Sequence, residues 1–377
     1  MHDLMNKYIG LFFCLAIVIS CEHSSQLSSF DYKDLKKAPV LSLEDVFEPI
    51  KFIPLKTTES HNISNILKVC MTEDSFYILT VNPFGIFRFA LDGSLISTIS
   101  GEGRAEGEYL IPTDIAYSKA DDVLYVADVA KGIMKFSSDG KYLSTVSTAT
   151  KYKIRQLLIS ESGSVIENVL NVTGNEREAI VELSQEGDTL NSVPNSLFFD
   201  CVTPTTIDTH HSLRKYSGEV LYNPMYCDTI YSYKSGQLIP KYAFSFPHRI
   251  TRKDLRDFNS VISDKQFIME FAEDSKNLYL SIFDRNWNYS HYILKKTDGI
   301  IYKGDFRLSD SFDTEFSPRW QDEGWLIDVL DPSTINYGYT RDITDDARQK
   351  AYSYLSSVGI EGITMESDPI IMLAKAK

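Results

Sequence analysis

Residues 76–93 read FYILTVNPFGIFRFALDG, and residues 124–140 read LYVADVAKGIMKFSSDG, which repeats almost the same pattern. Each stretch predicts a strand, a tight turn, a second strand and an Asp-Gly hairpin turn, where glycine supplies the positive φ that such turns need. Hairpin signals at the same spacing end later apolar runs, so that glycines stand at positions 93, 140, 187 and 236, with a fifth at 299. A strand-rich repeat of roughly 40–50 residues is typical of a propeller blade.

The repeats divide the chain into six blades, of which the third covers about 154–193, the fourth 216–246 and the fifth 266–306, while the sixth starts near Phe316. Two strand-like segments, 48–56 and 369–377, have no partner in their own neighbourhood. Because an unpaired edge invites aggregation, we expect the first to pair with the second and close the ring. The sequence therefore predicts an all-β, six-bladed propeller of four-stranded antiparallel blades over residues 40–377, in which the N-terminal strand completes the last blade.

Two short helical insertions interrupt this pattern. Thr251 and Asp254 form a capping-box pattern that predicts a helix ending near Ser263. Thr344 is a candidate N-cap for a second helix, with Asp345 and Asp346 in its first turn and Gly359 at its end.

The first 21 residues predict an export signal with a lipobox. Lys7 precedes an apolar stretch that is shorter than the about 20 residues needed to span a bilayer. Val18-Ile-Ser-Cys21 favours cleavage before Cys21 and acylation of that cysteine, although ordinary secretion with cleavage elsewhere remains the alternative. We therefore expect a signal over 1–21, a flexible polar tether over 22–39 and a lipid anchor. The expected place is the cell envelope, on the periplasmic side of the outer membrane, with surface display left open.

Composition and charge are those of an exported β-protein. Hydrophobic residues make up 43% of the chain and aromatic residues 12%, and the net charge is −14. Nucleic-acid binding requires basic patches, so the acidic balance argues against a nucleic-acid partner. After removal of the signal, Cys70, Cys201 and Cys227 remain besides Cys21. Both a Cys201–Cys227 bridge and buried free thiols are compatible with this set.

The crossover between the first two blades reads GEGRAEGEYLIPTDIA (101–116). With Tyr125-Val-Ala-Asp128, it resembles an NHL-type propeller repeat. Together with the lipobox, IPLKT (53–57) and DPIIMLAK (368–375), it makes the chain similar to the six-bladed β-propeller lipoproteins of gut anaerobes, an NHL-like family. The resemblance implies architecture, because the family has no settled activity. Ala105-Glu106 departs from the usual Gly-Pro-Gly-Glu-Tyr crossover.

Motifs that carry chemistry are scarce. The glycines at 101, 103 and 107 are not followed by a helix, and nearby glutamates would repel phosphate, so a crossover loop is favoured over a phosphate loop. His210 and His211 near Asp208 have metal-ligating groups, but adjacent strand residues point to opposite faces. We expect no metal and no cofactor, although a divalent cation in the channel is compatible with the abundant acids.

We expect two functions in order of preference. The first is a non-catalytic binding or scaffold module for a glycan, peptide or protein, and the alternative is a lactonase-like hydrolase or lyase using channel carboxylates and a divalent cation. Propellers host both classes, so the fold alone does not decide between them. Ligands of propellers bind where loops converge on one end of the channel. The candidate rim residues are Arg104, Glu106, Asp114, Arg155, Tyr222, Asn223, Arg285 and Trp320. Packing between blades and, for Arg104, an exposed pair with Glu106 or Glu108 are the structural alternatives.

Overall fold

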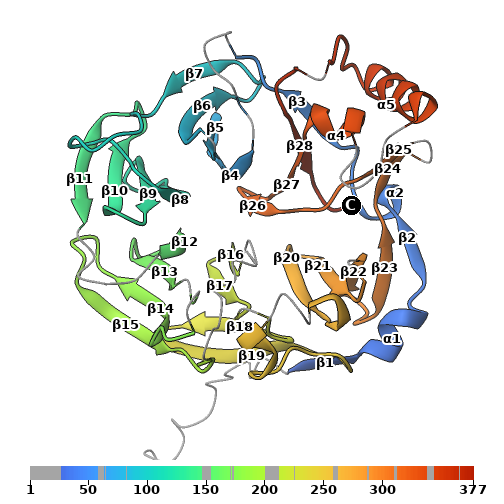
Figure 1. The fold of residues 1–377 in the computed structure, drawn as a ribbon, viewed down its shortest axis with the longest axis horizontal. Helices are drawn as coiled ribbons and strands as arrows, with labels where there is room; N and C mark the ends of the chain where they lie inside the picture. Colours follow the sequence, from blue (N-terminus) through green and yellow to red (C-terminus); the bar gives the residue numbers. More distant parts are fainter. Residues whose placement is uncertain are drawn as a thin grey trace, which may run out of the picture.

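The computed structural model describes residues 27–57, 63, 65–81, 83–146, 154–169, 171, 174–199, 212–224, 226–257, 262–286, 288–309, 312–337, 344–364 and 366–377. In these residues six small antiparallel sheets form a ring, as expected (Figure 1). The signal at 1–21, Cys21, Cys201 and the histidines at 210 and 211 lie outside the described residues.

Each blade is a four-stranded meander that runs from the channel outward. Blade 1 consists of β4 (Ile66–Met71), β5 (Ser75–Thr80), β6 (Gly85–Ala90) and β7 (Leu95–Thr98). Blade 2 consists of β8 (Pro112–Ser118), β9 (Val123–Asp128), β10 (Gly132–Ser137) and β11 (Tyr142–Val146). Blade 3 consists of β12 (Ile154–Ile159), β13 (Val165–Val169), β14 (Glu178–Leu183) and β15 (Thr189–Pro194).

The later blades follow the same plan with additions. Blade 4 consists of β16 (Leu213–Tyr216), β17 (Glu219–Tyr222), β18 (Thr229–Lys234) and β19 (Gln237–Ser245). Blade 5 consists of β20 (Phe267–Glu273), β21 (Asn277–Asp284), β22 (Asn288–Lys295) and β23 (Ile301–Asp305). Blade 6 consists of β26 (Trp320–Asp322), β27 (Trp325–Leu330), β28 (Ile370–Ala374) and β3 (Lys51–Pro54). A small hairpin of β24 (Arg307–Ser309) and β25 (Phe312–Glu315) lies between blades 5 and 6 in the chain.

The ring is closed by the two ends of the chain, as the sequence predicts. β28 pairs antiparallel with β3, with Ile371 opposite Ile53 and Met372 opposite Phe52. The chain then passes directly from β3 to the hairpin turn of blade 1, where Lys56 N–H donates to Gly93 O at 2.9 Å. A Cβ on Gly93, whose φ is +85°, would lie 2.1 Å from Pro54 O. Glycine at this hairpin is therefore required by close approach as well as by turn geometry.

The core lies between blades rather than inside any one sheet. Separate clusters of buried residues fill the six blade-to-blade interfaces. Between blades 1 and 2, for example, Tyr77, Tyr109 and Phe136 are at most 1% exposed. The abundance of Tyr and Phe thus reflects the filling of wedge-shaped gaps by large side chains.

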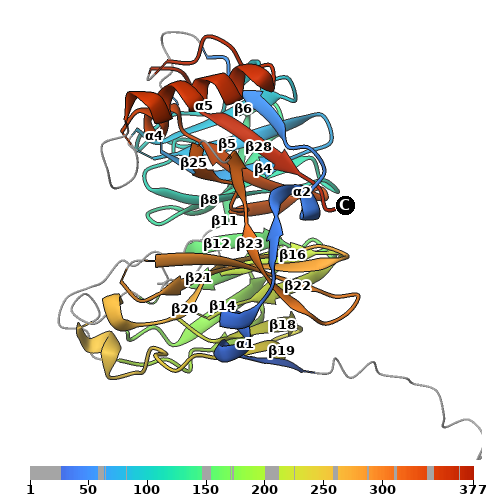
Figure 2. The same cartoon turned by 90° about the vertical axis from the view of Figure 1, so that its right-hand side faces the viewer.

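The expected tether over 22–39 is wrong from residue 28 onward. β1 (Ser28–Asp31) pairs in parallel with β19, α1 (Tyr32–Lys37) follows, and β2 (Val40–Ser42) pairs in parallel with β23. α2 (Leu43–Val46) then leads to β3, so that this segment runs along the outer wall of blades 4, 5 and 6 (Figure 2). Apolar anchors hold it there: the Phe30 ring stacks on Phe244 at 5.4 Å, and Leu35 is 1% exposed.

The two helical insertions differ in outcome. Thr344 caps α5 (Asp345–Ser357), as expected, by accepting from Ala347 N–H, and the short α4 (Pro332–Tyr337) precedes it. Within the expected helix from Thr251 to Ser263, the described residues form two 3₁₀ turns, η1 (Asp254–Asp257) and η2 (Ile262–Asp264), and residues 258–261 lie outside the described residues. Leu255 and Ile262 are both buried in one cluster. No helix in the described part of the chain is long and apolar enough to cross a membrane.

Candidate functional site in and beside the central channel

Four of the predicted rim residues are structural. Tyr222 and Trp320 are buried in the interfaces of blades 3–4 and 6–1. Asn223 donates from Nδ2 to Cys227 O and Thr229 O and holds the loop between β17 and β18. Asp114 is 3% exposed and lies between inner strands. Packing, the alternative considered for Tyr222, Asn223 and Trp320, explains the positions of these three residues.

The other rim residues do not converge with Asp114. Arg104 and Glu106 are exposed on a crossover that packs on outer strand β11, since a Cβ on Gly107 would lie 3.0 Å from Tyr142 Cβ. Arg285 is half-buried and pairs with Asp264 at 3.4 Å. Arg155 belongs to β12, but its side chain lies outside the described residues. The structure therefore does not bring Arg104 and Asp114 to one cavity.

The channel is instead crossed by polar side chains that bind the main chain of the neighbouring blade. Four such side chains each accept a hydrogen bond from an inner-strand N–H of another blade. The acceptor and donor pairs are Asp322 and Met71 (3.1 Å), Asp114 and Leu157 (2.9 Å), Gln156 and Leu213 (3.0 Å), and Gln321 and Glu273 (2.7 Å). Lys68 Nζ lies 3.4 Å from Asp114 Oδ1 and links blade 1 to blade 2. Each of these bonds satisfies a main-chain donor that the meander leaves facing the channel.

Arg214 completes this ring of contacts between blades 4, 5 and 6. Its Nε donates to Phe271 O at 2.8 Å and its Nη2 donates to Arg319 O at 2.6 Å. Burial lowers the pKa of the guanidinium to about 10, so the group remains charged at neutral pH. Burial also raises the pKa of the Asp322 carboxyl and of the neighbouring Cys70 thiol, which donates to Asp322.

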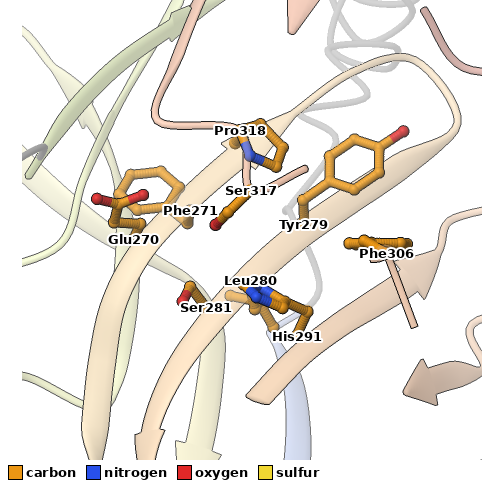
Figure 3. Close-up of a pocket in the computed structure, with 10 residues that line it drawn as sticks. Glu270, Phe271, Tyr279, Leu280, Ser281, His291, Phe306, Ser317 and Pro318 are labelled. Atoms are coloured by element: carbon orange, nitrogen blue, oxygen red, sulfur yellow. The ribbon is translucent and has the colours of Figure 1, made fainter. Parts of the chain in front are cut away.

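A hollow lies beside the channel between blade 5 and the segment that leads into β26 (Figure 3). Glu270, Ser281, His291 and Ser317 supply polar groups, and Tyr279 and Phe306 supply aromatic faces. His291 Nε2 lies 2.9 Å from Glu315 Oε2, and this hydrogen bond lowers the pKa of Glu315. The space accepts about one water molecule, so the hollow can hold the end of a polar group but cannot enclose a substrate.

The described side chains form neither a clustered metal site nor a disulfide. In the described part of the chain, no three His, Cys, Asp or Glu side chains lie together as a metal site would require. Cys70 and Cys227 are free thiols, so the Cys201–Cys227 bridge is not formed. Cys70 is buried, Cys227 is partly buried, and Cys201 lies outside the described residues.

Comparison with known protein families places the chain in one of them. The model of a family described as "Domain of unknown function (DUF4934)" matches residues 27–375. The chain belongs to the DUF4934 family. This match does not confirm the NHL-repeat assignment.

A solved structure similar to this DUF4934 chain shares its fold over nearly the whole chain. BF0058 of Bacteroides fragilis, whose name describes it provisionally as an exported protein, superposes with a TM-score of 0.69 at 15% identity and covers 93% of this chain and 99% of its own. A member of the DUF4221 family from Bacteroides vulgatus has a TM-score of 0.48 at 11% identity, with 69% and 85% covered. No curated protein matches the sequence.

Sequence reasoning missed most of the channel residues of this DUF4934 propeller. Lys68, Gln156, Arg214 and Gln321 each stand in a short inner strand next to a large apolar residue. A polar residue beside an apolar one in such a strand was the available signal. Its partner lies one blade away, however, and the repeat pattern does not say which main-chain group it meets.

Proposed function

We propose that this protein is a lipid-anchored cell-envelope propeller that acts as a non-catalytic binding or scaffold module for a glycan, peptide or protein. The observation that carries this proposal is the engagement of the channel side chains with the main chains of neighbouring blades. Groups such as Asp114 and Arg214 hold the ring together, and the adjoining hollow admits about one water. Recognition is therefore assigned to the outer surface of a rigid ring.

The anchor is part of the same proposal. The lipobox at Cys21 and the similarity to an exported propeller of Bacteroides fragilis support export to the envelope. Only six residues, 22–27, separate Cys21 from Ser28, the first residue of β1. Such a segment spans at most about 25 Å, so an acylated Cys21 would hold the outer edge of blade 4 close to the bilayer.

Replacement of Cys21 by alanine tests the anchor. We expect metabolic labelling with a fatty acid to mark the wild-type protein and to leave Cys21→Ala unmarked, because the thiol is the acylated atom. Cys227→Ala serves as a control that keeps Cys21 and should be labelled like the wild type. Label that persists in Cys21→Ala would reject the lipoprotein assignment.

The binding function is tested by screening residues 22–377 on glycan and peptide arrays, with elemental analysis of the same preparation. We expect saturable binding to one ligand class and no stoichiometric divalent metal. A stoichiometric metal that is lost on mutation of Asp114 or Glu270, together with turnover of lactone substrates, would favour the hydrolase alternative and contradict the proposal.

A further inference from the structure

The outer edges of the six blades are treated unequally by the chain. β1 covers the outer edge of blade 4 and β2 covers that of blade 5, both in parallel pairing (Figure 1). In blades 1, 2 and 3 the sheets end at β7, β11 and β15, and no strand among the described residues pairs beyond them. Just before β7, Lys56 N–H donates to Gly93 O and Lys56 pairs with Ser94, and the crossover at Gly107 packs on Tyr142 of β11.

The covered and uncovered edges also differ in sequence. β19 contains Pro240 and Lys241, and β23 contains Lys303 and Asp305, which are residues that discourage strand pairing. By contrast, β7 reads LIST, β11 reads YLSTV and β15 reads TLNSVP, which contain no charged residue and a single proline, Pro194 at the end of β15. The uncovered edges β7, β11 and β15 therefore carry fewer of the residues that discourage strand pairing than the covered edges β19 and β23 do.

Each uncovered strand presents one exposed aliphatic side chain at the same position, three residues after the hairpin glycine. Ile96 is 52% exposed, Leu143 is 48% exposed and Leu190 is 53% exposed. A row of main-chain groups beside an exposed aliphatic side chain is the arrangement that receives an added strand, because the main chain supplies affinity and the side chain supplies a packing surface.

The chain itself shows how such a strand is seated. Ser28–Asp31 runs parallel to residues 242–245 of β19, and its one aromatic residue, Phe30, stacks on Phe244 of the edge strand. β2 repeats the pairing on β23 with Leu41 opposite Gly304. Short, extended segments with one or two apolar residues are thus accepted at two of the outer edges of this ring.

We propose that the outer edges of blades 1, 2 and 3, formed by β7, β11 and β15, bind an extended, uncharged or basic segment of a protein partner by strand addition. This inference rests on the proposed binding function and names its partner class. A second copy of the chain is disfavoured as the occupant, because two molecules of net charge −14 repel one another, whereas a neutral or basic peptide does not meet that barrier.

The test uses a fluorescein-labelled hexapeptide, Ser-Phe-Ser-Val-Thr-Val, and residues 22–377 of the protein, with binding followed by fluorescence anisotropy. The triple variant Ile96→Lys, Leu143→Lys, Leu190→Lys should bind at least about tenfold more weakly than the wild type. Ile239→Lys is the matched control, since Ile239 is equally placed after its hairpin glycine and 39% exposed, but its strand already pairs with β1 at residues 242–245. Ile239→Lys should bind like the wild type.

A peptide with proline in place of the central serine should not bind, because it cannot complete the main-chain ladder. Equal binding by the triple variant and the wild type would overturn the inference and leave the binding function standing at another surface. If the hexapeptide fails to bind while the arrays give ligands, the strand-addition inference is wrong and the binding function stands. If neither the hexapeptide nor any array ligand binds, the inference and the binding function are both wrong. Sedimentation that shows wild-type dimers abolished by Leu143→Lys would overturn it in favour of a second copy.

Discussion

A chain that ends at Asp368 is expected to lose most of its folding stability. The missing strand, β28, lies between β27 and β3, and residues 370–374 are at most 1% exposed. Burial of an aliphatic side chain contributes roughly 1.5–3 kcal/mol, so the four large side chains of β28 together account for roughly 6 kcal/mol or more. That is comparable to the whole stability of a typical domain, about 5–15 kcal/mol. The truncation would also leave β3 unpaired and the ring open between blades 6 and 1.

The point variant Met372→Ala gives a milder form of the same test if the truncated chain does not fold. Met372 is fully buried, and its truncation should cost roughly 2–5 kcal/mol in urea-induced unfolding. Lys375→Ala is the control, because Lys375 is exposed and loses only its contact over the Trp325 ring. The closure would be contradicted if the truncated chain melted at the wild-type temperature.

The second large effect is expected at Glu167, a buried carboxyl in blade 3. Glu167 is fully buried, and neither carboxylate oxygen has a hydrogen-bond partner. Every second residue of a strand lies on the same face, so Glu167 shares a face of β13 with Val165 and Val169. These two valines belong to one buried cluster with Ala116 and Ala127 of blade 2, so the Glu167 side chain faces that apolar interface. Desolvation raises its pKa from 4.5 to about 7.

The sign of the pH dependence follows from this shift. Between pH 4.5 and 7 the folded chain keeps a proton on Glu167 that the unfolded chain releases, so the free energy of unfolding falls as pH rises. The loss amounts to roughly 3 kcal/mol and is complete above pH 7. Glu167→Met removes the group that must ionise in an apolar setting. This variant should be more stable than the wild type at pH 8 by roughly 3 kcal/mol, with little change at pH 5.

Urea unfolding at pH 5 and pH 8 measures both quantities. Glu186→Met, at an exposed hairpin position of the same blade, is the control and should keep the wild-type pH dependence. If Glu167→Met is no more stable than the wild type at pH 8, ionisation of the Glu167 carboxyl does not destabilise the folded ring, and the prediction is wrong.

These two effects differ in how far the sequence alone foretold them. The closure could be predicted because two strand-like ends lacked partners and a ring has only one place for both. The site of Glu167 could not, because an acid inside VIENV reads like any solvent-facing strand residue until the neighbouring blade is placed on it. Strand β1 was missed for a related reason. The stretch Ser28-Ser-Phe-Asp31 has the composition of a tether, and only the Phe244 ring across the edge makes it a strand.

The candidate rim shows the same limit. The sequence puts Arg104 in a crossover loop, and the structure shows this residue exposed. The position of the crossover relative to the channel depends on its packing on Tyr142, which no local sequence pattern reveals. Tyr222 and Asn223 looked like ligand groups because aromatic and amide side chains serve recognition and loop anchoring equally well.

Hydrogen exchange of residues 22–377 with and without the tightest ligand from the arrays tests most directly whether this ring is a binding module that works from its outside. We expect slowed exchange at amides of β7, β11 or β15 and unchanged exchange at the inner strands, which are already held by Asp114, Gln156 and Arg214. Slowed exchange confined to the inner strands β8, β12 and β20 would place the ligand in the channel and contradict the account.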